Sequence, residues 1–81
     1  MIHTLPQEII AQWTISGPNS EGHTFICYAE EALWMCGYGA QGLTCHRIDV
    51  QAYAEGSTYR HRGRAKVLTW LEAEGLISTQ R

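Results

Sequence analysis

The stretch HTFICYAEEALWMCGYGAQGLTCHRIDVQAYA, residues 23–54, decides the fold of this chain. It is rich in β-branched and aromatic residues, and a pair of glutamates and a glycine-rich segment interrupt it. Turns near 31–32 and 40–41 would divide it into an antiparallel meander, because short breaks between runs of this kind are typical of hairpins. We therefore expect a small antiparallel sheet of three to four strands.

Three cysteines would form one row across this meander. The expected turns place Cys27 opposite Cys36, and Cys36 opposite Cys45. An odd number of cysteines cannot complete a disulfide framework, so we expect buried thiols that act as small core residues. A zinc site formed by these three with His46 or His23 is the weaker alternative, because structural zinc sites usually take their ligands from tight C-x2-C pairs. We expect no metal and no other cofactor.

Two segments fit more than one element. Residues 29–37, AEEALWMCG, are helix-forming residues that end in a glycine, but they could equally turn at the glutamates and return as a strand. The second segment is residues 5–15. TLPQ at residues 4–7 is a capping-box pattern that would start a helix there, whereas the apolar residues recur at every second position from Ile9 onward, as in a strand. For this second segment we favour a strand that starts after Pro6.

Residues 46–54, HRIDVQAYA, alternate more regularly. Ile48 and Val50 would share one face with two alanines, while Asp49 and Tyr53 fall on the other face. This alternation predicts a further strand.

The C-terminal segment carries the strongest helical pattern. Apolar residues within 67–71 form a stripe at helical spacing, and Gly75 stands where a left-handed cap residue belongs. Leu76 is placed to contact Leu71, as the Schellman motif requires. The sequence therefore predicts an α+β fold, in which a small meander packs against one C-terminal α-helix within a single domain over residues 1–81.

Composition narrows the class of protein. The chain has 81 residues, of which 44% are hydrophobic and 17% charged, a balance typical of a folded domain and not of a disordered chain. No apolar run reaches the roughly 18–20 residues that a membrane-spanning helix needs, and the N-terminus lacks a signal-peptide pattern. We expect a cytoplasmic protein without a membrane partner.

Residues 59–66, YRHRGRAK, concentrate positive charge in a chain whose formal net charge is −2. They occupy the first turns of the predicted helix or lead into it, where the helix dipole disfavours each exposed cation by about 0.3–1 kcal/mol. Glu72 and Glu74 repeat the misfit at the opposite pole. A run of charges is often only a solvated face whose members pair with carboxylates. Cations at the positive end of a helix that no visible interaction compensates mark a candidate functional site. We call these residues the basic patch: Tyr59, Arg60, His61, Arg62, Arg64 and Lys66.

Motifs for catalysis are missing from the sequence. It contains no nucleophile elbow, phosphate-binding lysine motif or zinc-protease signature, so we do not expect an enzyme. GYGAQG at residues 37–42 matches the dinucleotide-binding fingerprint literally, but that fingerprint needs a doubly wound sheet too large for this chain. We expect turn glycines there.

The sequence favours a small non-enzymatic binding or inhibitor protein. The basic patch would engage an acidic protein surface or a nucleoprotein complex, with Tyr53, Tyr59 and Trp34 as exposed aromatic contacts. In size and lack of motifs the chain resembles phage and mobile-element inhibitors, including anti-CRISPR proteins. The alternative is a nucleic-acid-binding module or small transcriptional regulator that contacts phosphates through the same patch, although such domains are usually basic and this chain has a pI of about 6.0.

Two further expectations follow. Replacing Arg60, Arg62 and Arg64 together by Ala should weaken partner binding and leave stability unchanged or slightly raised, because the cations sit at the wrong helix pole. A small open sheet also leaves edges to cover, which would permit a homodimer through a sheet edge.

Overall fold

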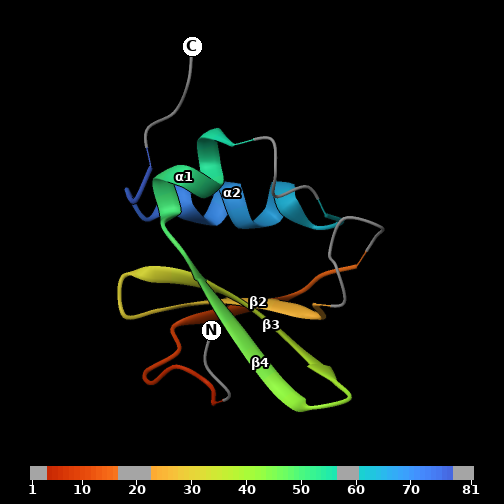
Figure 1. Ribbon diagram of the computed structural model, residues 1–81. Coiled ribbons are helices and arrows are strands. Elements are labelled where there is room, and N and C mark those ends of the chain that lie inside the picture. The colour runs from red at the N-terminus through yellow and green to blue at the C-terminus, as the bar shows by residue number, and fades with distance from the viewer. Residues whose placement is uncertain (1–3, 17–22, 57–60, 78–81) are drawn as a thin grey trace.

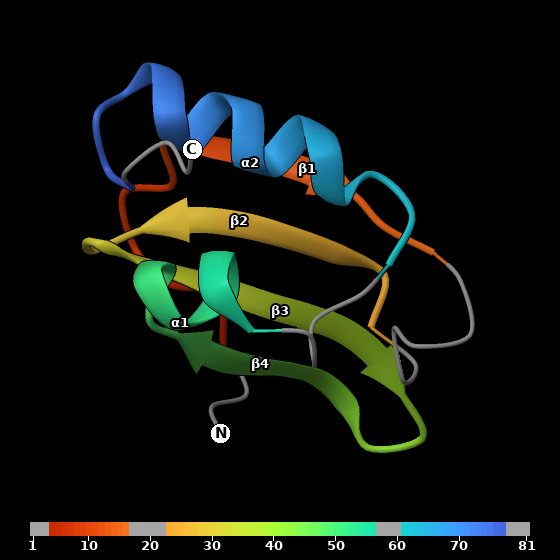
Figure 2. The same cartoon turned by 90° about the horizontal axis from the view of Figure 1, so that it is seen from above.

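A computed structural model describes residues 4–16, 23–56 and 61–77. The four strands form one antiparallel sheet in the order β1-β2-β3-β4, and two helices cover one of its faces (Figures 1 and 2). The predicted α+β meander with a C-terminal helix is confirmed. The elements are β1 (Ala11–Thr14), β2 (Phe25–Ala29), β3 (Ala32–Gly39), β4 (Gly42–Ile48), α1 (Val50–Glu55) and α2 (Arg64–Ala73).

The main core lies between the sheet and the helices. Seen from above, α2 runs over β1 and β2, while α1 lies over β3 and β4 (Figure 2). Each strand turns every second residue toward the helices, as expected for a strand. Helix α2 buries Val67 and Leu71, which lie one turn apart on the same face of the helix. The buried side chains of this core are Ile15, Ile26, Tyr28, Leu33, Met35, Ile48, Tyr53, Val67 and Leu71.

Helix α2 ends as the sequence predicts. Gly75 has a φ of 74°, in the left-handed region that glycine adopts without strain. The Leu76 N–H donates to the Leu71 carbonyl at 2.9 Å, and the Gly75 N–H donates to the Glu72 carbonyl at 3.0 Å. These two bonds are the pair that defines a Schellman motif. Leu76 also packs against the cluster that contains Leu71.

The hairpin between β2 and β3 settles the segment 29–37 as strand. Its two-residue turn consists of Glu30 and Glu31, whose φ angles are 54° and 63°. Two consecutive positive φ angles are the mark of a type I′ turn, which matches the twist of the flanking strands but usually contains Asn or Gly. The turn lies one residue earlier than we expected, so the register shifts by two. Cys27 therefore pairs with Trp34 and not with Cys36.

The prediction of a strand over residues 46–54 is wrong beyond Ile48. Strand β4 ends there and α1 begins at Val50. The Asp49 carboxylate accepts hydrogen bonds from the Gln51 and Ala52 N–H groups at 3.1 and 3.2 Å, which is an N-cap interaction. A two-turn helix is short enough that its apolar residues also fit a period of two, so alternation alone could not separate the alternatives.

A second cluster occupies the opposite face of the sheet. Residues 4–10 run beneath that face, on the side away from the helices (Figure 1). The strand that we expected after Pro6 begins only at Ala11, as β1. Ile9 from this segment packs against the cluster, and the Trp34 Nε1–H donates to the Ala29 carbonyl at 2.9 Å. Trp34 is buried, so our expectation of an exposed aromatic there is wrong. The buried members of this cysteine cluster are Cys27, Ala29, Trp34, Cys36 and Cys45.

The cysteines share one face although the predicted pairing of Cys27 is wrong. Cys36 lies opposite Cys45, as expected, and all three thiols are free and fully buried. His46 follows Cys45 in β4, so its side chain points to the other face, where it is exposed. Within residues 4–16, 23–56 and 61–77, no group of three or more His, Cys, Asp or Glu side chains could hold a metal ion. His46 therefore lies on the opposite face of β4 from Cys45, with which the alternative zinc site would combine it.

Neither helix in the described part of the chain combines the length and the apolar character needed to cross a membrane.

Candidate binding surface

The basic patch joins the edge of the sheet to the start of α2. Tyr59 and Arg60 lie outside the described residues. The Arg62 N–H donates to the Ser16 carbonyl at 2.8 Å, which forms an isolated β-bridge just beyond the end of β1. Gly63 follows as the N-cap of α2 with a φ of 90°, and a Cβ at this position would lie 3.4 Å from the Thr14 carbonyl oxygen. The close approach and the left-handed backbone together favour glycine here, and they hold the patch against β1.

The Arg64 side chain binds backbone carbonyls of the protein itself and is not available to a partner. Its Nη2 donates to the backbone carbonyls of Tyr53 at 2.9 Å, Gly56 at 3.2 Å and Ala54 at 3.4 Å. These carbonyls lie at the C-terminal end of α1, where the helix dipole is negative and favours a cation. The guanidinium carbon also lies 5.3 Å from the centre of the Tyr53 ring, within cation–π range.

The helix-dipole argument therefore does not apply to Arg64. Its charge belongs to the first turn of α2 in the sequence, but in space it neutralises the carbonyl end of α1. The expectation that replacing Arg64 leaves stability unchanged has lost its physical basis.

Tyr53 and His61 form a hydrogen-bonded pair beside Arg64. Tyr53 is fully buried, so the expectation that it is an exposed aromatic contact is wrong. Its hydroxyl lies 2.8 Å from His61 Nε2, and His61 Nδ1 lies 3.0 Å from the Arg62 carbonyl oxygen. Because a carbonyl can only accept, Nδ1 donates to the Arg62 carbonyl, and in the neutral imidazole Nε2 then accepts from the tyrosine hydroxyl. Burial raises the pKa of Tyr53 to about 12, partly opposed by the charge of Arg64. His61 thus helps to close the core at this point.

Arg62 and Lys66 are the two cations of the described patch whose side chains remain available. Both are exposed, and neither side chain makes a hydrogen bond or ion pair with any described residue. They flank the N-terminal, positive pole of α2, and the first turn of that helix contains no acidic residue to balance them. At the opposite pole Glu72 and Glu74 are exposed as well. The predicted reversal of charge along α2 therefore holds for its exposed side chains.

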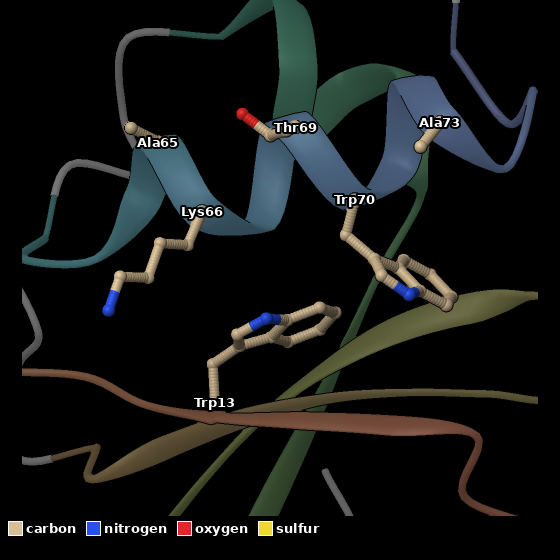
Figure 3. Close-up of a pocket in the computed structure, with 6 residues that line it drawn as sticks. All are labelled: Trp13, Ala65, Lys66, Thr69, Trp70 and Ala73. Carbon is tan, nitrogen blue, oxygen red and sulfur yellow. The ribbon is translucent and has the colours of Figure 1, made fainter.

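A groove opens beside these cations, between α2 and the edge strand β1. Figure 3 shows Trp13 rising from β1 and Trp70 descending from α2, with Lys66 on the same side of the helix. The two indole rings meet edge to face at 5.4 Å and 70°, and Tyr28 extends the aromatic contact at 5.3 Å from Trp70. We call this the tryptophan groove; its volume is about 490 Å³, and it is lined by Trp13, Ala65, Lys66, Thr69, Trp70 and Ala73.

Our reading of the sequence missed the tryptophan groove. Trp70 belongs to the apolar stripe expected for the C-terminal helix, but its side chain is only half-buried. Part of the signal is local, because Ala65, Thr69 and Ala73 recur every fourth residue and give α2 one face of small side chains. The other wall comes from Trp13 in β1, and only the tertiary structure brings it to this helix.

A second hollow, of about 410 Å³, lies where the chain enters β1 and where β2 turns into β3. It is lined by Glu8, Ile10, Tyr28, Glu30 and Glu31, and its three glutamates all have positive φ angles. The Gln7 N–H donates to the Glu30 carboxylate at 3.0 Å.

Comparisons of the chain with protein-family models, with curated proteins and with solved structures find no match.

Proposed function

We propose that this protein is a non-enzymatic binding protein that engages another macromolecule through the exposed cations of the basic patch. The observation that carries the proposal is the state of Arg62 and Lys66, which are exposed and have no carboxylate partner among the described residues. Two cations without a described partner at the positive pole of α2 cost stability, and a negatively charged partner would offset that cost. Arg62 and Lys66, with Arg60 before them in sequence, are the proposed contacts.

An acidic protein surface, or a protein already holding nucleic acid, is the preferred partner. The chain has a formal net charge of −2, so naked nucleic acid would meet overall repulsion outside the patch. Direct phosphate contact by a nucleic-acid-binding module or small transcriptional regulator is the second candidate, supported by the same two cations. The narrower proposal that the binding is inhibitory, as in phage-encoded anti-CRISPR proteins, rests on chain length and the lack of catalytic motifs.

Fluorescence anisotropy against duplex DNA and single-stranded RNA separates the two partner classes. The proposal expects no salt-sensitive binding to either nucleic acid near physiological ionic strength. Binding that falls steeply with salt, with a logarithmic slope near 0.9 for each phosphate neutralised, would instead support the nucleic-acid module.

Affinity capture with charge variants tests the surface itself. One bait is the double variant Arg62→Gln with Lys66→Gln. The control bait is Arg47→Gln, because Arg47 is an exposed cation on β4 away from the patch. A partner held by the wild type and by the control, but lost by the double variant, would support the proposal. A partner that the double variant retains would rule out the patch as its binding surface.

A further inference from the structure

We propose that the tryptophan groove receives an apolar side chain from an acidic peptide segment of the partner. This inference rests on the proposed function and extends it, because it adds a second and chemically different contact beside the cations. The occupant is a segment of another protein in which a Leu, Phe or Trp stands next to Asp or Glu.

The shape of the groove favours an inserted side chain. Ala65, Thr69 and Ala73 are exposed and small, so these three positions of α2 leave the half-buried Trp13 and Trp70 accessible from the side. The site is an open and mostly apolar groove with aromatic walls, and its volume falls within the range of ligand-binding sites. Aromatic anchors in pockets of this type supply much of the affinity of protein interfaces.

The charge around the groove selects an acidic occupant. Lys66 lines the groove, whereas no carboxylate does among the described residues. Arg62 precedes the first turn of the same helix, so a second cation, which has no partner among the described residues, lies near that end. A partner segment that places its anchor between the indoles would therefore bring a neighbouring carboxylate within reach of these cations.

The same walls fit a protein side chain better than a nucleobase. Trp13 and Trp70 meet at 70°, so they present no parallel pair of ring planes between which a base could stack. Beyond the Lys66 ammonium and the two indole N–H groups, the lining side chains offer a single hydroxyl, that of Thr69, for hydrogen bonds to a base edge.

A displayed library of random peptides, about twelve residues long, tests the inference with the whole protein as bait. We expect selected peptides to combine an excess of Asp and Glu with at least one Leu, Phe or Trp, and to change the tryptophan fluorescence on binding. Ala73→Phe fills the groove from an exposed position and should weaken these peptides by about tenfold or more. Lys66→Gln should weaken them by about threefold and reduce their salt dependence.

Matched controls separate the groove from general effects of substitution. Ala52→Phe makes the same change at an exposed position of α1, and Arg47→Gln removes a cation outside the patch. Both should bind the selected peptides as the wild type does, and circular dichroism should show that all variants are folded.

Three outcomes would overturn the inference: no enrichment of any peptide, selected peptides without an acidic bias, or equal binding to Ala73→Phe and Ala52→Phe. The proposed function fails separately. If the captured partner is lost by the Arg62 and Lys66 variants but kept by Ala73→Phe, the result supports the role of the basic patch and contradicts the inference about the groove. If the partner is kept by the charge variants, the basic patch itself fails.

Discussion

Arg64→Met should destabilise this protein far more than Arg62→Met, although both remove an arginine from the same charged run. Methionine keeps an apolar stem against the Tyr53 ring but removes the donors that reach the carbonyl end of α1. Arg62 is exposed and its side chain makes no hydrogen bond or ion pair with any described residue, so the same change there removes no such interaction among them.

The size of the effect follows from the contacts of Arg64. A single Nη2 carries two hydrogens, so its three carbonyl contacts count as about two full bonds, each worth about 1.5–3 kcal/mol for a charged donor. The buried Nε of Arg64 has no partner among the described residues, so removing that atom stabilises the variant by about 1–2 kcal/mol. With partial exposure reducing the gain further, we expect a net loss of about 2–3 kcal/mol. A chain of 81 residues has a total stability of about 4–12 kcal/mol.

Thermal unfolding followed by circular dichroism measures this loss. For a domain of this size, about 2–3 kcal/mol corresponds to a fall in Tm of roughly 10–20 °C. Arg64→Lys should fall between wild type and Arg64→Met, because the ammonium keeps the charge on a shorter side chain without the planar fork. Urea titration should show a lower midpoint with an unchanged slope. Melting temperatures of Arg64→Met and Arg62→Met within about 3 °C of each other would refute the role assigned to Arg64.

Burial raises the pKa of Cys27 and Cys36, so the native thiols should react with DTNB about 100-fold more slowly than the thiols of the urea-unfolded chain; immediate reaction would contradict their burial. Burial also raises the pKa of Tyr53 to about 12, so the folded state keeps a proton that the unfolded state releases. The contribution of this proton to the free energy of unfolding is complete below about pH 10 and is lost as the pH rises toward 12. The free energy of unfolding should therefore fall less steeply with pH in Tyr53→Phe; an unchanged slope would exclude this titration as a cause. Glu31→Gly should raise the free energy of unfolding by about 1 kcal/mol in urea titrations, because residue 31 has a φ of 63°, and a loss of stability would argue against the type I′ turn.

The elements that could be predicted are those whose signals lie within a few residues. The end of α2 is the best example, because Gly75 and Leu76 form their capping bonds with carbonyls of the preceding turn. The turn between β3 and β4 was also predictable, since alternation and turn residues are local, whereas residues 29–37 fitted a helix as well as a turn and a strand. Glu30 and Glu31 are uncommon in a type I′ turn, so the turn was placed one residue late and the register of Cys27 was wrong.

The candidate binding surface was predictable only in part. The sequence located the basic patch and the reversed charge along α2, but it could not separate Arg62 from Arg64, which differ by two positions. The difference arises because the Arg64 side chain donates hydrogen bonds to the carbonyl end of α1, whereas the Arg62 side chain makes no hydrogen bond or ion pair with any described residue. The tryptophan groove was missed because its two walls come from distant parts of the chain.

Composition, periodicity and the order of turn residues determined by themselves that this chain forms a small meander with a C-terminal helix, and that its positive charge gathers before that helix. These properties depend on backbone geometry and on neighbours within one or two turns. Only the tertiary structure decided which cations remain free, that Tyr53 is buried, and that Trp13 meets Trp70. The reason is physical: burial, hydrogen-bond partners and local dielectric depend on which remote element covers a side chain, and that information is not contained in the neighbouring residues.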